Sequence, residues 1–499
     1  MSMEPSPKPS VISNRPRWPR WLAGLVFAVS AVLLLLGARG DLHIDEVVSL
    51  NAALDRTSWV AIFTEHQNDN THLLNSLGLR ALGWQSHFWV YRLPSVISCL
   101  GLLAVLALAA RRFGPGTAIW VLVLAGLSFP IILYGSEARG YAPAMFFAVA
   151  AYELMQRRRE RASRLNLVLF WACLVLGMLA QFTFLMVCLA LGIWQLARDH
   201  FAGAGWRTRA GNVIKYFGVP LVCLAVLYVV FLRHMIILGG LVEPWWKALS
   251  DFATYLLGFA PDAWPLRVVA GLLMLGVLLG GLVKMFREKR EEWVFWAAIF
   301  FVAPALVLLG MRPQFLYYRY FAVCFPFFYL LLGWLLARWF AGGGRFRWLA
   351  VAVLAAMVWG QGVKTAGLLR FGRGHYRQAM LDMAAATPGP VIRMCSDHDF
   401  RNGTLALFYA HFLPPGKTLA YIPRAKRDAE WPDWFVAGCM DPAFAAYPDI
   451  EVAGIGTYDR FGVYPYCGSS GLSWFVYRRP PGLVPPPAPR RLEAPPLAH

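Results

Sequence analysis

The sequence has 499 residues, of which 58% are hydrophobic and 15% are charged. Its apolar residues come in repeated long runs, which is typical of a protein that crosses a membrane many times and excludes an ordinary soluble domain. The formal net charge of +19 does not indicate nucleic acid as a partner, because the basic residues stand in short clusters between apolar runs, where they orient a chain in the bilayer.

Residues 1–20 form a basic, proline-rich tail that precedes the apolar run Leu22–Gly37. No small-residue cleavage site follows this run, so we expect a retained signal-anchor helix whose tail is cytoplasmic. The first loop, residues 38–87, is then extracytoplasmic. Its amphipathic stretches Val47–Leu54 and Leu73–Leu82 are expected to be helices on the membrane surface.

Basic clusters and apolar runs alternate through the rest of residues 21–363, the predicted transmembrane domain. We expect Thr117–Leu133 to be one span. The run Leu165–Ala197 is interrupted near Gln181, and at about 1.5 Å per residue it is long enough for two short spans. The pattern predicts about eleven transmembrane helices, and this odd number places the carboxyl end outside the cytoplasm.

The composition changes after Lys364. Residues 364–480 read as a small extracytoplasmic α/β domain, with a helix at Tyr376–Ala386, a strand at Val391–Met394 and a helix at Gly403–Phe412. The proline-rich tail 481–499 is predicted to be disordered. An extracytoplasmic compartment is oxidising, so we expect one disulfide among three cysteines, with Cys439–Cys467 as first choice and Cys395 as the third.

A dense group of ionisable residues, Asp41-Leu42-His43-Ile44-Asp45-Glu46, directly follows the first membrane segment. Such a group at the edge of a bilayer is costly unless it faces water, so it indicates a functional site. A solvated acidic loop is the alternative.

Two further segments face the same side in this topology: the turn 134–141, with Glu137 and Arg139, and the loop 311–320, with Arg312 and Arg319 among tyrosines. Arginine binds phosphate through a planar fork and keeps its charge. A partly desolvated carboxylate can take a proton from an attacking hydroxyl. The three segments together suit an anionic, lipid-linked substrate with a polar part.

The runs Tyr91–Ser95, Ala109–Gly114 and Tyr134–Ala142 resemble the bacterial dolichyl-phosphate-mannose-protein mannosyltransferase-like family. These are GT-C class membrane glycosyltransferases, and they include lipopolysaccharide-core galacturonosyltransferases and relatives of the lipid A aminoarabinose transferase. The resemblance covers roughly residues 20–200 well and the later spans only in general character.

Single motifs match this family as well. The segment His43-Ile44-Asp45-Glu46 resembles its first-loop acidic motif, whose Asp is taken as the catalytic base. Glu137-Ala138-Arg139 is similar to its second acidic motif, and Arg319-Tyr320 resembles the Arg-Tyr that opens a late span. The chain departs from the family at Thr71-His72-Leu73-Leu74, where many relatives have His-Pro-Pro-Leu.

The resemblance implies an inverting transfer of a sugar from a polyprenyl-phosphate donor to an acceptor hydroxyl, outside the bacterial inner membrane. The acceptor would be a lipid, a glycan or a protein. No metal or other cofactor is expected, although Asp41 and Asp45 offer oxygen ligands to a divalent ion. The implied roles are catalysis for Asp45, Glu46 and Glu137, donor-phosphate binding for Arg139, Arg319 and Arg92, and substrate binding for His43, His72, Tyr141 and Tyr320.

Each assignment has a structural alternative. Glu46 faces a different way from Asp45 on any regular element, so the alternative to its catalytic role is that it only caps the helix or forms an ion pair. Glu137 and Arg139 can form an ion pair at a helix start, and Arg92 can anchor the interface. His72 can be an ordinary loop histidine, and the tyrosines can form an interfacial belt.

Two other functions compete with the glycosyltransferase. A transporter or flippase of lipid-linked sugars would carry polar residues along several spans at mid-depth and discontinuous helices in paired halves. A glycan polymerase or ligase would use a diphosphate donor and would leave the Glu137-Ala138-Arg139 match unexplained.

Overall fold

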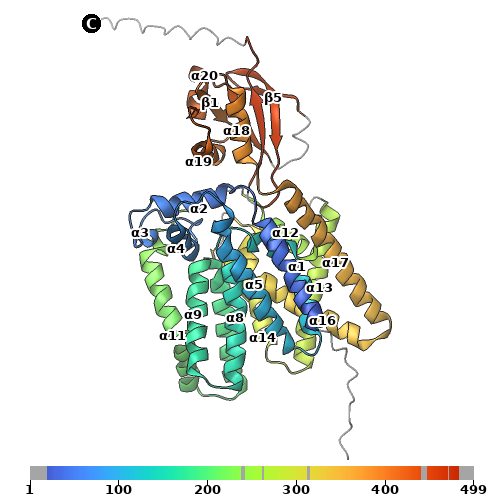
Figure 1. Ribbon diagram of the computed structural model, residues 1–499. Helices are drawn as coiled ribbons and strands as arrows, with labels where there is room; N and C mark the ends of the chain where they lie inside the picture. Colours follow the sequence, from blue (N-terminus) through green and yellow to red (C-terminus); the bar gives the residue numbers. More distant parts are fainter. Residues whose placement is uncertain are drawn as a thin grey trace, which may run out of the picture. The chain divides into compact units, whose positions relative to one another are not determined.

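The computed structural model describes residues 20–237, 242–260, 263–311, 315–439, 447–469 and 471–482 (Figure 1). The two tails expected from the sequence lie almost entirely outside these ranges, and Arg312 is also outside them. The chain forms two compact units. The helical unit comprises Met1–Leu35, Phe63–Asn75 and Leu93–Thr365, and the sheet unit comprises Leu36–Ile62, Ser76–Arg92 and Ala366–His499.

Most of the described helices belong wholly or mainly to the helical unit. Their bounds are α1 Arg20–Gly37, α5 Trp89–Arg111, α6 Thr117–Gly126, α7 Phe129–Gly135, α8 Tyr141–Glu160, α9 Arg164–Ala180, α10 Leu185–Phe201, α11 Trp206–Val230, α12 Trp245–Leu257, α13 Trp264–Arg287, α14 Trp293–Ala297, α15 Ala303–Leu306, α16 Phe325–Gly342 and α17 Gly344–Phe371. Figure 1 shows α8, α9 and α11 side by side, and the three helices pack in that order.

Six helices among the described residues are long and apolar enough to cross a membrane, or seven if one bent pair counts as a span. Three shorter apolar helices accompany them, at Trp21–Gly37, Arg164–Ala180 and Trp293–Leu309. A multi-span helical protein is therefore confirmed, whereas the expected number of about eleven spans is not. Short helices fall below the length that a single apolar crossing requires, so the sequence alone cannot fix the count.

The expected single span Thr117–Leu133 is two helices, α6 and α7, that meet at 64°. Ser128 begins α7 as its N-cap, with Pro130 in the first turn, and both residue types favour a new helix start. Backbone groups freed by the bend find polar partners inside the bundle, as the apolar surroundings require. The amide of Phe129 donates to Gln361 Oε1 at 2.9 Å, and Ser128 Oγ donates to the Tyr329 hydroxyl at 2.8 Å.

The interruption expected near Gln181 is confirmed, because α9 ends at Ala180 and a 3-10 turn, Phe182–Phe184, precedes α10. Helix α16 forms the centre of the helical unit: its span Tyr318–Gly342 is 94% buried, and α6, α8 and α13 pack against it. The span of α13 is only 17% buried. Its exposed leucines and valines suit contact with lipid.

A six-stranded mixed sheet forms the carboxyl-terminal part of the sheet unit, in the order β2-β1-β3-β6-β5-β4. Strand β1 is parallel to β2 and β3, whereas the other neighbours are antiparallel. The bounds are β1 Val391–Ser396, β2 Thr418–Tyr421, β3 Trp434–Cys439, β4 Asp449–Val452, β5 Gly456–Tyr464, β6 Ser473–Arg478, with helices α18 Tyr376–Ala386, α19 Thr404–Tyr409 and α20 Arg427–Glu430. The expected helix at 376–386 and the strand that begins at Val391 are both present.

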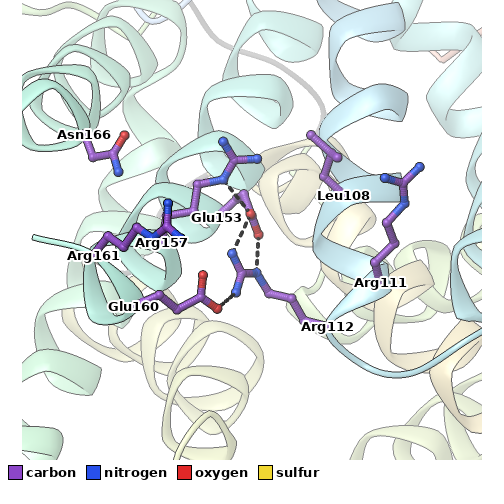
Figure 2. A pocket seen from close by; sticks show the side chains of 8 residues that line it. All are labelled: Leu108, Arg111, Arg112, Glu153, Arg157, Glu160, Arg161 and Asn166. Carbon is purple, nitrogen blue, oxygen red and sulfur yellow. Dashed lines mark hydrogen bonds and ion pairs between the residues drawn. The ribbon is translucent and has the colours of Figure 1, made fainter. Parts of the chain in front are cut away.

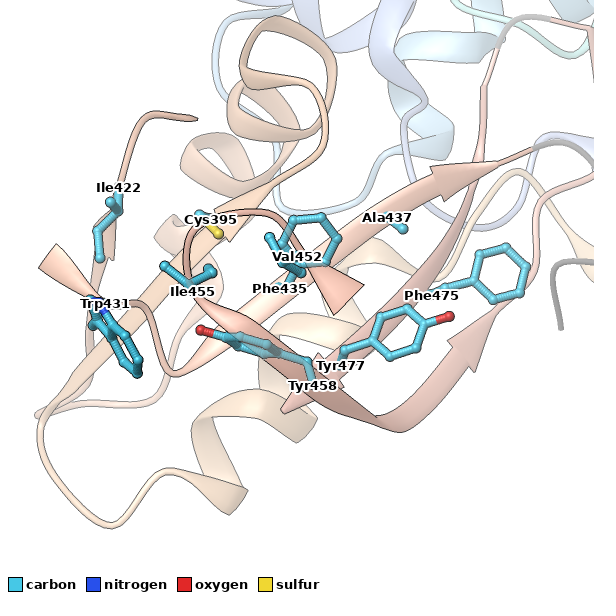
Figure 3. Packing of buried hydrophobic residues seen from close by; sticks show 10 residues of the cluster. All are labelled: Cys395, Ile422, Trp431, Phe435, Ala437, Val452, Ile455, Tyr458, Phe475 and Tyr477. Carbon is cyan, nitrogen blue, oxygen red and sulfur yellow. The ribbon is translucent and has the colours of Figure 1, made fainter. Parts of the chain in front are cut away.

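Consecutive buried residues on the central strands β3 and β6 give this sheet a core of its own. Figure 3 shows aromatic residues of β3, β5 and β6 packed with side chains of the connecting segments, among them Phe435, Tyr458, Phe475, Trp431 and Ile455. Helix α18 packs against β5 and β6. The Cys467 thiol is free, so the expected Cys439–Cys467 disulfide is not formed.

The sheet unit also includes first-loop helices: α2, Ile44–Asp55, with parts of α3, Ala61–Thr64, and α4, Leu73–Leu82. Both amphipathic stretches expected in this loop are therefore helical. Helix α2 packs against α19, and the Phe88 ring meets the Tyr409 ring edge-on at 5.9 Å. The Tyr409 hydroxyl donates to the Leu42 carbonyl at 2.8 Å, and the Arg377 amide donates to Asp41 Oδ2 at 2.7 Å.

Candidate functional site

The acidic motif begins helix α2. His43 is the N-cap, with an extended backbone (φ −82°, ψ 171°), and its amide donates to the Glu46 carboxylate at 3.2 Å. This reciprocal arrangement is a capping box, which satisfies amide groups that a helix start leaves open. Asp45 and Glu46 lie in the first turn, where negative charge is favourable. Asp45 is partly exposed, whereas Glu46 is buried.

Arg92 holds this helix start in place from inside the sheet unit. Its side chain is fully buried, and it forms a two-point ion pair with Glu46, at 2.9 Å from Nε and 2.6 Å from Nη2. The same guanidinium donates to four consecutive carbonyl groups, at residues 38, 39, 40 and 41, over 2.7–3.1 Å. The Arg92 side chain thus fixes the entire chain segment that leads into α2.

Two residues, His43 and Arg92, flank the Glu46 carboxylate and favour its negative charge. His43 Nδ1 lies 2.8 Å from Glu46 Oε2, and Arg92 occupies the other side. Although burial opposes ionisation, these two neighbours hold the pKa of Glu46 well below its ordinary value, so it is a carboxylate. Burial instead raises the pKa of Asp41, despite the amide of Arg377 that it accepts. Among the described residues, His43 Nε2 has no hydrogen-bond partner.

The second motif forms a buried turn in the helical unit. Glu137 and Arg139 are 1% and 3% exposed, and the Arg139 amide donates to the Glu137 carbonyl at 2.8 Å. Arg139 Nη1 donates to Asn70 Oδ1 at 2.6 Å, and its guanidinium carbon lies 5.6 Å from the centre of the Tyr141 ring. Buried, oriented and next to an aromatic ring, this guanidinium is suited to an anionic ligand.

Gly140 lets this turn approach the end of α9. A Cβ at this position would lie 1.8 Å from the carbonyl oxygen of Ala180 and 2.9 Å from His72 Nδ1. His72 Nδ1 donates to that same Ala180 carbonyl at 3.0 Å, which sets the proton on Nδ1. The His72 and Tyr141 rings meet edge-on at 5.2 Å. His72 therefore has a structural partner and also faces the arginine turn.

The third motif lies on a 3-10 helix, Tyr318–Cys324, that packs against α8. The Arg319 guanidinium carbon lies 4.8 Å from the centre of the Tyr317 ring. Tyr320 is within electrostatic reach of Arg319, Tyr141 and Asp69. The helical unit therefore brings together His72, Arg139, Tyr141, Arg319 and Tyr320, which we call the arginine–tyrosine cluster.

The predicted site residues thus fall into two groups. His43, Asp45, Glu46 and Arg92 gather at the start of α2 in the sheet unit, and the arginine–tyrosine cluster and Glu137 belong to the helical unit. Two residues that contact Arg139 were not predicted from the sequence. The side-chain oxygen of Asn70 accepts a hydrogen bond from the Arg139 guanidinium, and the Ser95 hydroxyl donates to the Arg139 carbonyl at 3.1 Å. The only sequence signal for Asn70 is its place in the polar run Asn68-Asp69-Asn70.

Metal ligands do not gather at either group. Across the described ranges no three His, Cys, Asp or Glu side chains are placed to share an ion. The arrangement supplies hydrogen-bond donors and positive charge directly from arginine side chains.

Comparison with solved structures identifies the fold. The crystal structure of ArnT from Cupriavidus metallidurans in the apo state is similar to this chain with a TM-score of 0.52 and 14% identity, over 92% of this chain and 98% of that chain. The same protein bound to undecaprenyl phosphate gives a TM-score of 0.50 and 15% identity, over 94% and 99%. No family model and no curated protein matches the sequence. ArnT is a GT-C class lipid A aminoarabinose transferase, so the expected likeness to GT-C enzymes is confirmed for the fold.

Proposed function

We propose that the protein is an integral-membrane glycosyltransferase that moves a sugar from a polyprenyl-phosphate donor to an acceptor hydroxyl. One observation carries the proposal: the fold matches, over nearly the full length of both chains, that of ArnT bound to undecaprenyl phosphate. The arginine–tyrosine cluster supports it independently, because it offers two guanidinium groups for a phosphate.

Arg139 and Arg319 are proposed to hold the donor phosphate. As the bond from the anomeric carbon to the phosphate oxygen breaks, both electrons remain on the departing polyprenyl phosphate. Fixed positive charges in surroundings of low dielectric stabilise that developing charge more effectively than water does. Arg139 is oriented beforehand by Asn70 and Tyr141, which reduces the reorganisation needed during the reaction. Tyr141 and Tyr320 bind the sugar part of the donor in this proposal.

Asp45 is proposed to be the general base. It takes the proton of the acceptor hydroxyl while the acceptor oxygen bonds to the anomeric carbon from the face opposite the phosphate, so the configuration inverts. Its partial exposure suits a group that has to meet a substrate. Glu46 and Arg92 are occupied with each other, which favours a positioning role for both: they fix the helix turn that carries Asp45.

The remaining predicted residues receive supporting roles. Glu137, buried in the same turn as Arg139, is proposed to orient that arginine or to hold the acceptor. His43 offers Nε2 to the acceptor, since its Nδ1 is engaged with Glu46. His72 shapes the donor side through its contacts with Ala180 and Tyr141.

The proposed setting is the bacterial inner membrane, with a cytoplasmic amino terminus and an extracytoplasmic carboxyl-terminal domain. The acceptor would be a lipid, glycan or protein of the cell envelope, and the reaction would need no metal. Transfer that continues in excess chelator would agree with the last point. Mass spectrometry of envelope glycans from cells with and without the gene would identify the sugar and the acceptor.

A binding experiment tests the donor assignment. Undecaprenyl phosphate is titrated into the purified full chain and into Arg139→Gln, and we expect affinity to fall tenfold or more, since a charge-assisted contact is lost. Arg139→Lys should recover part of it, and Arg164→Gln, an exposed change at the start of α9, should bind as the unaltered protein does. Equal binding by Arg139→Gln would remove Arg139 from the donor site.

The transporter alternative has one observation in its favour, the bent pair α6 and α7, since discontinuous helices are common in transporters. The described residues contain one such pair, whereas paired halves would call for two. Purified protein in detergent separates the functions: an enzyme releases or transfers the donor sugar without a membrane, and a flippase does not. A polymerase or ligase would require a diphosphate-linked donor in the same assay.

A further inference from the structure

A cavity of about 520 Å³ opens in the helical unit among the ends of α5, α8 and α9 (Figure 2). It is separate from the arginine–tyrosine cluster, because its residues lie at the far ends of α5 and α8, at least twelve positions along the helix from Ser95 and Tyr141. Its charged lining consists of four arginines and two glutamates: Arg111, Arg112, Arg157, Arg161, Glu153 and Glu160.

Two of the arginines are held by the glutamates. Figure 2 shows Arg112 between Glu153 and Glu160; its Nε and Nη2 each lie 2.8 Å from a Glu153 oxygen, and Nη1 contacts Glu160. Arg157 Nε contacts the Glu153 carboxylate as well, at 2.9 Å. The Glu153 side chain is only 6% exposed, so this ion-pair network is a fixed part of the cavity wall.

The other two arginines leave the cavity with surplus positive charge. Within the described part of the chain, the ion pairs at the cavity involve Arg112 and Arg157, and neither Arg111 nor Arg161 pairs with a carboxylate. Asn166 also lines the cavity, and Ser163 caps the α9 start there by accepting from the Asn166 amide at 3.4 Å. The start of a helix adds positive potential to that of the arginines. An anion is therefore the ligand that the cavity favours.

The cavity also adjoins surface that suits acyl chains. Leu108 lines it and is 36% exposed, and on α9, beside Asn166, Leu165 and Val168 are 66% and 54% exposed. An apolar helix face that ends in a basic recess is the arrangement in which the headgroup of an acidic lipid is bound at the membrane boundary. A soluble anion would gain nothing from the apolar neighbours.

We propose that this recess binds the phosphate of an anionic glycerophospholipid, with Arg111 and Arg161 as the principal contacts and the acyl chains along α9. The site is independent of the proposed transfer reaction. It is a lipid site that would tie this end of the bundle to acidic membrane.

Native mass spectrometry of the purified, delipidated full chain tests the proposal, with phosphatidylglycerol and cardiolipin as probes and phosphatidylcholine as reference. We expect the acidic lipids to bind preferentially. The double variant Arg111→Gln/Arg161→Gln should bind them roughly tenfold or more weakly, because each basic side chain at an acidic lipid surface contributes a factor of about five. Glu160→Gln, at an exposed glutamate, should bind them more tightly.

The matched control removes two exposed arginines elsewhere, in Arg345→Gln/Arg347→Gln. These residues follow α16, whose Phe340 contacts Trp120 near the start of α6 at 5.4 Å, so they lie at the same end of the bundle. We expect the control to bind acidic lipids within twofold of the unaltered protein. Equal losses in both double variants, or unchanged lipid binding in Arg111→Gln/Arg161→Gln, would overturn the proposal.

A separate arm distinguishes lipid from soluble phosphate. Millimolar inorganic phosphate should leave bound phosphatidylglycerol in place, and full displacement would show that the recess is a site for a soluble anion. If Arg111→Gln/Arg161→Gln unfolds, the Glu160→Gln variant is the test. Tighter binding of the acidic lipids by Glu160→Gln supports the lipid site, and unchanged or weaker binding contradicts it.

Discussion

Arg92 is the side chain whose removal should cost the sheet unit most. It is fully buried, pairs with Glu46 at two points and donates to four carbonyl groups. Arg92→Gln leaves the Glu46 carboxylate buried without its main partner, and breaking a buried pair in this way costs about 3–5 kcal/mol. We expect a loss of that size in the free energy of unfolding, measured by denaturant or thermal unfolding of the purified protein.

Arg92→Lys should lose most of the same stability, because an ammonium group cannot reproduce the two-point contact with a carboxylate. The control is Arg370→Gln, an exposed position of the same unit, which should change stability by less than about 0.5 kcal/mol. An unchanged free energy of unfolding in Arg92→Gln would show that the segment before α2 is held by other contacts.

Glu46 gives stability a defined dependence on pH. Its pKa in the fold is well below the ordinary value of 4.5, so its contribution is fully present above about pH 4.5 and is lost as the pH falls towards the pKa in the fold. We expect the melting temperature to fall in acid, and Glu46→Gln to flatten this fall. Burial raises the pKa of Asp41, so its effect on stability has the opposite dependence on pH. Asp41 therefore cannot account for a loss of stability in acid. An equally steep acid loss in Glu46→Gln would refute the assignment.

For single residues, the sequence indicated which residue types matter but not which of them are in contact. The sequence pattern identified Asp45, Glu46 and Arg92, yet the pairing of Glu46 with Arg92 joins residues 46 positions apart. Asn70 was missed because a single amide in a polar loop looks like any other turn residue. Its function depends on Arg139, which reaches it only in the folded chain.

Among the elements, the turn before α8 depends on one close approach. Gly140→Ala would place a methyl group 1.8 Å from the Ala180 carbonyl oxygen, and a backbone atom cannot yield as a side-chain end can. We expect the change to displace the Arg139 turn and to lower both the yield of folded protein and undecaprenyl phosphate binding. The measurements are size-exclusion chromatography, thermal unfolding and the binding titration.

The control for this substitution is Gly192→Ala, inside α10, where an added methyl group has no atom within 4 Å. It should be neutral or stabilising by up to about 1 kcal/mol, because alanine favours a helix over glycine. Normal folding and binding in Gly140→Ala would mean that the turn can move away from α9 without harm.

Local signals predicted several elements correctly, and the failures have physical reasons. The helix at 376–386 and the break after Ala180 follow from periodicity and polar residues. The bend at Ser128 was missed because the run stays apolar on both sides of it, and it is stabilised by Gln361 and Tyr329 from distant helices. Strand order in the sheet depends on contacts between segments far apart in the sequence. The alternation of apolar and polar residues along one strand cannot specify these contacts.

For the molecule as a whole, the composition predicted a multi-span membrane protein, and the motifs predicted a fold similar to that of ArnT. The likeness to ArnT extends over 92% of this chain at 14% identity, so a common architecture persists where few side chains match. The predicted number of spans is not confirmed, because several apolar helices are short, bent or partly π-helical. The union of first-loop helices with the carboxyl-terminal sheet in one unit was not foreseen, since the segments lie some 300 positions apart in the sequence.

The most direct test of the proposed chemistry is sugar transfer by purified protein from undecaprenyl-phosphate-linked donors, with Asp45→Asn compared against Asp55→Asn. Asp55 is exposed at the other end of the same helix, so it controls for loss of a carboxylate. If Asp45 is the base, Asp45→Asn should lower the rate by about 10²–10⁴-fold with unchanged thermal unfolding, while Asp55→Asn stays active. Undiminished transfer by Asp45→Asn would contradict the mechanism.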